Sequence, residues 1–154
     1  MSAMDAPETA LLVGRHVGRY RVSRHIASGG MGAVYEVVQD SIGHRAAMKV
    51  LSGHLTRDPK HRKYVDRFLD EARAVNLINH PGVLQIFDYG EMPDQTVYIL
   101  MEFIEGKSLG DYLTKLRDGT HKRLSIYQTM QLVRQIASVM TVAHEKGVLH
   151  RDLK

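Results

Sequence analysis

The 154-residue sequence contains no cysteine. A disulfide framework, a zinc site built from thiolates and a cysteine nucleophile are therefore excluded, and a reducing compartment is permitted. No stretch approaches the roughly 18 apolar residues that a membrane-spanning helix needs. Near the N-terminus, Asp5 stands where a secretory signal carries positive charge, and the apolar run Leu11–Val13 is too short for a signal core. We therefore expect a cytoplasmic protein with no membrane segment in this chain.

The composition is that of a folded domain with a mild basic excess. Hydrophobic residues make up 44% of the chain, enough for a core of ordinary size. Lys and Arg together number 21, against 17 for Asp and Glu. This excess would suit a polyanionic ligand such as a nucleoside triphosphate, but charge alone selects no function.

The first part of the chain predicts a small antiparallel sheet with one helix. Residues 1–18 are small and polar without a period, and we expect a disordered lead-in there. Loose alternation in Tyr20–Ile26 and β-forming residues in Ala33–Val38 predict a hairpin around a glycine turn at Ala27–Gly32. Three further strands and one amphipathic helix are predicted at Ala46–Leu51, Val83–Tyr89, Thr96–Ile104 and, for the helix, Tyr64–Ile78.

The second part of the chain has the pattern of helices. Ser108 with Asp111, and Ser125 with Gln128, have the spacing of capping boxes, and they predict a short helix and a long helix that ends at Gly147. Apolar residues at helical spacing predict a continuous buried face on the long helix. This face consists of Ile126, Met130, Val133, Ile136, Met140 and Ala143.

Together these elements predict an α+β fold in two lobes. Residues 19–104 are expected to form a five-stranded antiparallel sheet with one helix. Residues 105–154 are expected to contribute the first two helices of a second, helical lobe.

The glycine-rich segment Ile26–Gly32 is a candidate phosphate site. Glycines let backbone N–H groups approach phosphate oxygens and tolerate positive φ. A hairpin turn that merely needs flexible residues is the alternative. A dinucleotide-binding fingerprint would need a helix after the glycines, whereas a strand is expected here, and the sequence contains no G-x-x-x-x-G-K-[ST] of a P-loop.

Charged residues in two other places could act on a phosphate. Lys49 lies in an apolar strand, so it either occupies an exposed edge or points its ammonium at an anion. Glu71 on the predicted helix could pair with it, although surface ion pairs are common. In the final H-R-D-L-K, Asp152 could accept a hydroxyl proton and Lys154 could neutralise phosphoryl charge, unless this is only a charged loop after a helix.

In this order, the glycine loop, Lys49, Glu71 and His150–Lys154 resemble the eukaryotic-like protein kinase family. The resemblance covers the chain from about Tyr20 onward. The segments M-G-A-V-Y and H-P-G-V-L-Q-I-F-D are most similar to those of bacterial serine/threonine kinases. The fold it implies is the kinase N-lobe with the start of the C-lobe, truncated within the catalytic loop.

The resemblance implies a binding site for the phosphates of ATP. Gly29 and Gly32 would cover these phosphates, Lys49 would hold the α and β phosphates, and Glu71 would orient Lys49. The family's first loop glycine is replaced by Ala27, the smallest change available. All positions that the resemblance assigns to ATP are Ile26, Ala27, Ser28, Gly29, Gly30, Gly32, Val34, Ala47, Lys49, Glu71, Met101, Glu102 and Ile104.

It also implies a site for the adenine base. Val34, Ala47 and Met101 would enclose the base. In Met101–Ile104, which resembles the hinge between the kinase lobes, the Glu102 carbonyl and the Ile104 N–H would hydrogen-bond to it.

Catalysis would fall to the last residues of the sequence. Asp152 is similar to the family's catalytic base and Lys154 to its γ-phosphate contact. Arg151 is similar to the arginine that pairs with a phosphorylated activation loop. Lys154 also favours serine/threonine substrates, because tyrosine kinases usually carry Ala or Arg at this position.

The metal ligands of the family, an Asn and the Asp of D-F-G, come later in its motif and are not among these 154 residues. The cofactors implied are ATP and Mg²⁺, with no metal ligand in this chain, and we expect negligible kinase activity from this polypeptide. We favour the interpretation that the chain is the N-terminal part of a longer kinase. That kinase is expected to act on proteins with Ser/Thr and to bind no nucleic acid. The alternative is a truncated, non-catalytic module that binds nucleotide or docks a partner. In either case the apolar face of the long helix would be exposed.

Overall fold

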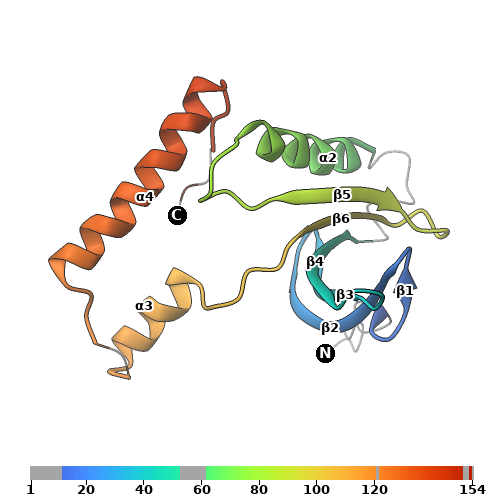
Figure 1. The fold of residues 1–154 in the computed structure, drawn as a ribbon, viewed down its shortest axis with the longest axis horizontal. Coiled ribbons are helices and arrows are strands. Elements are labelled where there is room, and N and C mark those ends of the chain that lie inside the picture. Colours follow the sequence, from blue (N-terminus) through green and yellow to red (C-terminus); the bar gives the residue numbers. More distant parts are fainter. Residues whose placement is uncertain (1–11, 53–61, 121, 151–152, 154) are drawn as a thin grey trace, which may run out of the picture. The chain divides into compact units, whose positions relative to one another are not determined.

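The computed structural model describes residues 12–52, 62–120, 122–150 and 153. The chain divides into two compact units. One consists of Met1–Asn76 and Leu84–Phe103, the other of Leu77–Val83 and Ile104–Lys154. In the described part of the chain, the first unit holds the strands and helix α2, and the second holds helices α3 and α4 (Figure 1).

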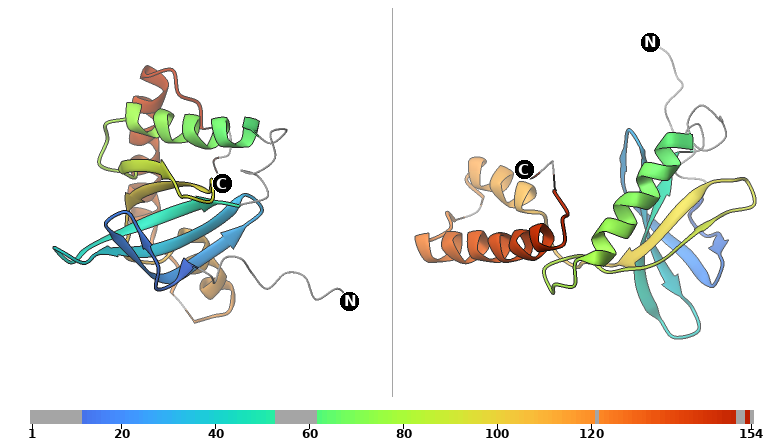
Figure 2. Two further views of the ribbon diagram at one scale, coloured as in Figure 1. Left: turned by 90° about the vertical axis from the view of Figure 1, so that its right-hand side faces the viewer. Right: turned by 90° about the horizontal axis from the view of Figure 1, so that it is seen from above.

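The first unit is built on an antiparallel sheet that has six strands among the described residues, in the order β1-β2-β3-β4-β6-β5. The strands curl strongly, as both views in Figure 2 show. Their bounds are β1 His16–Val17, β2 Tyr20–Gly29, β3 Gly32–Gln39, β4 His44–Leu51, β5 Ile86–Glu91 and β6 Val97–Glu102. The α+β fold class is confirmed, but the expected number of five strands is wrong by one.

The additional strand is β1, which lies in the segment expected to be a lead-in. Its two residues pair with β2, Val17 opposite Tyr20 and His16 opposite Arg21. Gly18, at φ +56°, allows the tight turn between the two strands. Val17 is buried in the core. A strand of two residues is too short to show a period in the sequence, so pattern analysis missed it.

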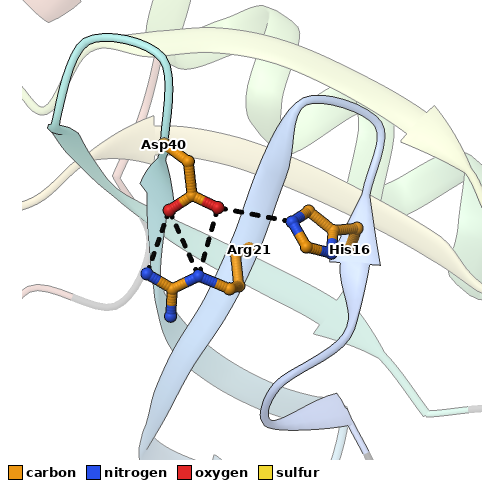
Figure 3. Close-up of polar contacts among 3 residues, drawn as sticks. All are labelled: His16, Arg21 and Asp40. Carbon is orange, nitrogen blue, oxygen red and sulfur yellow. Dashed lines mark hydrogen bonds and ion pairs between the residues drawn. The ribbon is translucent and has the colours of Figure 1, made fainter.

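Three polar side chains tie this edge of the sheet to the turn after β3 (Figure 3). Arg21 donates hydrogen bonds to both carboxylate oxygens of Asp40 at 2.9–3.1 Å, and His16 Nε2 lies 3.3 Å from Asp40 Oδ2. The hydrogen bonds from Arg21 hold the pKa of the Asp40 carboxyl below its ordinary value. All three side chains are substantially exposed, so the cluster orients the turn more than it stabilises the fold.

The glycine turn is tighter than expected. The β2–β3 ladder continues through Ser28 opposite Ala33 to Gly29 opposite Gly32. The turn therefore contains only Gly30 and Met31, instead of the whole of Ala27–Gly32.

Alternation along the strands separates two apolar clusters, one on each face of the sheet. One cluster consists of Val17, Tyr20, Val22, Ala33, Tyr35, Val37, Ala46, Met48, Val50 and Leu100. On the other face, α2 (Arg62–Leu77) packs Phe68 and Ala72 against Leu51, Val97 and Ile99. The predicted amphipathic helix is thereby confirmed.

The second unit contains α3 (Leu109–Arg117) and α4 (Ile126–Glu145). Both predicted capping boxes are present: Ser108 with Asp111, and Ser125 with Gln128, each exchange two hydrogen bonds. The predicted buried face of α4 is wrong for this chain. Of the described residues of α4, only Ala143 is buried.

The apolar side chains of α4 are exposed because they find little neighbouring surface among the described residues. Exposure is highest at Ile126, at 82%, and the other exposed members of the stripe are Met130, Val133 and Ile136. This agrees with the expectation that the chain leaves this face uncovered.

A short segment between α2 and β5 belongs to the helical unit through contacts with α4. Gly82 N–H donates to His80 Nδ1 at 2.9 Å, so the proton of the neutral ring lies on Nε2, which donates to Ser138 Oγ at 3.0 Å. A Cβ atom on Gly82 would lie 2.8 Å from the side chain of Val139. No helix in the described part of the chain is long and apolar enough to span a membrane.

Candidate functional site

The strand register brings the predicted base and phosphate residues to one face of the sheet. Lys49 lies opposite Val34, and Ala47 lies opposite Met101. Directly opposed residues of antiparallel strands point to the same side, and so do residues two apart on one strand. These four residues therefore share the face against which α2 packs.

Lys49 and Glu71 form an ion pair within this unit. Lys49 Nζ lies 3.9 Å from Glu71 Oε2, and the side chains are 37% and 65% exposed. The ammonium also lies 5.2 Å from the ring centroid of Phe68, which is buried beneath it. Because α2 is fixed by its own packing, Glu71 is held beside Lys49. The pair is loose and solvent-accessible, which leaves the ammonium able to bind an anion.

The glycines of the hairpin tip differ in what they do. Gly29 and Gly30 are exposed, and a Cβ atom on either would have no atom within 4 Å. The backbone of this tip is therefore open to an incoming group. Gly32, at φ +152°, is required by the fold itself, because a Cβ atom there would collide with the carbonyl oxygen of Val50.

The residues of β2 that precede the glycine tip contact each other and β3. His25 Nε2 lies 2.7 Å from Ser28 Oγ, and the His25 ring contacts the edge of Tyr35 with centroids 5.5 Å apart. Ala27 lies opposite Val34 in the ladder, and Ile26 is partly exposed at an irregularity in β2.

The Met101–Ile104 segment lies where β6 ends and the chain leaves the sheet. Met101 is half-buried, and Glu102 makes the last ladder pair of β6, with Ala46. Glu102 N–H also donates to the Gln85 carbonyl at 2.8 Å. Ile104 is the first residue of this stretch in the helical unit, and it is 67% exposed.

A charged cluster that was not predicted from the sequence lies on the same face. Glu36, opposite Ala47, is only 6% exposed and accepts hydrogen bonds from Arg24 Nε at 2.6 Å and Arg45 Nε at 2.7 Å. The hydrogen bond from Arg45 is the main reason that the pKa of the Glu36 carboxyl lies below its ordinary value. The signal for this cluster was a glutamate within the apolar run of β3, a charge that needs partners when buried.

The predicted catalytic residues Asp152 and Lys154, together with Arg151, lie outside the described residues. Among the residues that the structure describes, no group of three or more His, Asp or Glu side chains could hold a metal ion. The described residues thus offer an anion a solvent-accessible ammonium on β4 and an open glycine tip between β2 and β3, but they do not supply a Mg²⁺ site.

This combination of a curled antiparallel sheet, a helix carrying the glutamate partner of a strand lysine, and a glycine hairpin defines the N-terminal lobe of a kinase-like fold. The protein kinase domain family matches residues 20–154. The chain belongs to this family and corresponds to a part of its catalytic domain.

Similar proteins agree with this assignment. The chain is 39% identical over 141 residues to the serine/threonine-protein kinase PknA of Mycobacterium tuberculosis, covering 89% of this chain and 31% of PknA. It is 41% identical over 144 residues to the serine/threonine-protein kinase Pkn1 of Myxococcus xanthus, covering 93% of this chain and 19% of Pkn1. The chain thus spans less than a third of the length of these curated relatives.

Solved structures give the same fold. The crystal structure of the kinase domain of Mycobacterium tuberculosis PknI superposes with a TM-score of 0.70 at 28% identity, covering 94% of this chain and 55% of that one.

Proposed function

We propose that this chain forms the ATP-binding part of a protein serine/threonine kinase, which transfers the γ-phosphoryl group of ATP to a Ser or Thr hydroxyl of a protein. The observation that carries the proposal is the pairing of Lys49 with Glu71 on the sheet face that also bears Val34 and Ala47. The serine/threonine kinases among the relatives support it. A location in the cytoplasm, where ATP is available, belongs to the same proposal.

The described residues would act through position and charge. The open backbone at Gly29 would approach the phosphates, and the Lys49 ammonium would neutralise charge on the α and β phosphates. Glu71 would hold that ammonium in place. Val34, Ala47 and Met101 would enclose the adenine base.

Two further contacts complete the assignment to adenine. The Glu102 carbonyl would accept a hydrogen bond from the base and the Ile104 N–H would donate one. Each is a backbone group, so base selectivity would depend on the conformation of this stretch and not on its side chains.

Catalysis is assigned to residues outside the described part. Asp152 would accept the proton of the attacking hydroxyl, and Lys154 would neutralise charge on the transferring phosphoryl group. Mg²⁺, when bound in the family, supplies charge neutralisation of the phosphates. Because the Asn and the D-F-G Asp that hold the metal in the family are not among its residues, we expect negligible phosphoryl transfer by the 154-residue chain itself.

Calorimetric titration with a non-hydrolysable ATP analogue tests the binding part of this proposal. Lys49→Ala should weaken binding of the analogue about tenfold, equivalent to about 1.4 kcal/mol, and should leave binding of adenosine unchanged. Lys63→Ala, which removes an exposed lysine from α2, is the matched control and should bind like the original chain. Equal affinity of the analogue for the original chain and for Lys49→Ala would refute the role of Lys49.

A second candidate function is a non-catalytic module that docks a partner. The exposed apolar side chains of α4 favour it. An assay of metal-dependent autophosphorylation tests what the two functions share, because detectable transfer by the bare chain would contradict both the module and the expected inactivity.

A further inference from the structure

The buried carboxylate of Glu36 joins two arginines on the nucleotide-facing side of the sheet. Each carboxylate oxygen accepts one hydrogen bond, Oε2 from Arg24 and Oε1 from Arg45. The Glu36 side chain is 7% exposed, whereas those of Arg24 and Arg45 are 58% and 43% exposed. Glu36 is thus an anchored centre from which the two guanidinium groups extend outward.

Arg45 extends over the ring of Phe103. Its guanidinium carbon lies 4.3 Å from the ring centroid, a close cation–π contact, and that of Arg24 lies 5.9 Å from the same centroid. A planar guanidinium can stack on a ring and still donate through Nε, as Arg45 does to Glu36. Lysine has no equivalent geometry.

Phe103 lies one step beyond the ladder between β4 and β6. The last backbone pair of these strands is Ala46 with Glu102, so Arg45 and Phe103 would form the next pair in the same register. Beyond the last backbone pair of β4 and β6, the two strands remain in contact through the side chains of Arg45 and Phe103. The chain thus leaves the sheet with the Phe103 side chain held from β4.

We propose that Glu36 and Arg45 are positioning residues that fix the backbone at Phe103, and through it the two peptide groups assigned to adenine. This inference rests on the proposed function for its second half only. The Glu102 carbonyl belongs to the peptide that precedes Phe103, and the Ile104 N–H belongs to the peptide that follows it. Both peptide groups flank the one residue that Arg45 holds, although neither Glu36 nor Arg45 is expected to touch the nucleotide.

The first test measures the backbone without any nucleotide. Amide hydrogen exchange is followed by NMR in the original chain and in Arg45→Lys, Glu36→Gln and Phe103→Leu. We expect exchange at Glu102, whose N–H donates to the Gln85 carbonyl at 2.8 Å, to be several-fold faster in each variant. In Arg45→Lys the amides of β2 and β3 should be unchanged. Arg21→Lys is the matched control, because the Arg21 side chain is also 43% exposed and also pairs with a carboxylate. Unchanged exchange at Glu102 in Arg45→Lys would overturn the proposal.

The second test measures the preference for adenosine over inosine. Inosine carries a proton on N1 and a carbonyl at C6, so it cannot make either of the two backbone hydrogen bonds. Arg45→Lys should weaken adenosine binding about fivefold and leave inosine binding almost unchanged, which lowers the preference by the same factor. A general loss of structure would weaken both nucleosides equally, and this result would overturn the proposal.

The two tests also separate this inference from the proposed function. Absence of adenosine binding by the original chain would count against the proposed function, and the exchange rates would still decide whether Arg45 fixes the backbone. Faster exchange with an unchanged nucleoside preference would show that the contact does not serve base recognition, and would overturn the inference while leaving the role of Lys49 intact.

Discussion

A Cβ atom on Gly32 would collide with the carbonyl oxygen of Val50. Gly32 begins β3 and lies opposite Leu51, the last residue of β4, so the glycine hairpin returns to the sheet directly against the neighbouring backbone. Backbone cannot move aside as a flexible side chain can. The last glycine of the loop is therefore required by the fold, whatever else it does for a phosphate.

Substitution of two loop glycines should therefore separate stability from binding. Gly32→Ala should lower the free energy of unfolding by about 2–4 kcal/mol, because it combines an unfavourable φ with a backbone collision. Gly29→Ala should change it by less than about 0.5 kcal/mol, because its Cβ atom would meet no other atom. Urea unfolding followed by circular dichroism measures both. We further expect Gly29→Ala to weaken binding of the ATP analogue, and equal stability of the two variants would contradict this account.

The Lys49–Glu71 pair should matter for binding and hardly for stability. Exposed ion pairs contribute about 0–1 kcal/mol, and the 3.9 Å separation is long. Glu71→Gln should leave the thermal midpoint almost unchanged while weakening the ATP analogue several-fold, because Lys49 loses its partner. Asp70→Asn is the matched control: Asp70 precedes Glu71 on α2 and pairs with Arg73 at 2.8 Å, away from the site. If the two variants bind the analogue equally well, Glu71 does not orient Lys49.

Glu36 should make the fold sensitive to acid. Its folded-state pKa lies below the ordinary value, so ionised Glu36 stabilises the fold above its unfolded-state pKa, and this contribution is lost as the pH falls through the folded-state pKa. Glu36→Gln should lower stability at pH 7 by about 1–3 kcal/mol, because two arginines lose a charged acceptor. It should also flatten the dependence of stability on pH in the acid range.

Unfolding by urea at a series of pH values measures this dependence. Part of the acid sensitivity should remain in Glu36→Gln, because the pKa of Asp40 is lowered as well. Glu91→Gln, at an exposed position of β5, should retain the full dependence on pH. If the stability of Glu36→Gln falls with decreasing pH as steeply as that of the original chain, the buried carboxylate does not contribute to the acid sensitivity.

Local sequence signals accounted for much of the fold. Both capping boxes were predicted because Ser108 and Ser125 act on groups only three residues away. β1 was missed because two residues carry no period. The buried face of α4 was wrong because periodicity reports which side chains would pack together, and cannot tell whether a neighbouring surface is present.

The candidate site also contains some residues that the sequence predicts and some contacts that it does not. Lys49 and Glu71 were found because their order along the chain matches a known family, and the ion pair follows from that family's packing. The contact of Arg45 with Phe103 joins residues far apart in the sequence and depends on the register of β4 with β6. That register is set by the whole sheet, so no local pattern could have revealed it.

The exposed stripe on α4 should make this chain self-associate. Ile126, Met130 and Val133 recur at helical spacing and are all exposed, so they form one apolar surface on the helix. Val133→Glu should shift the chain toward the monomer in sedimentation-velocity experiments, because a charge at the centre of the stripe opposes its burial. Gln135→Glu adds the same charge at another exposed position of α4 and serves as the control. Equal association of the two variants, or a monomer at all concentrations of the original chain, would show that the stripe does not drive association.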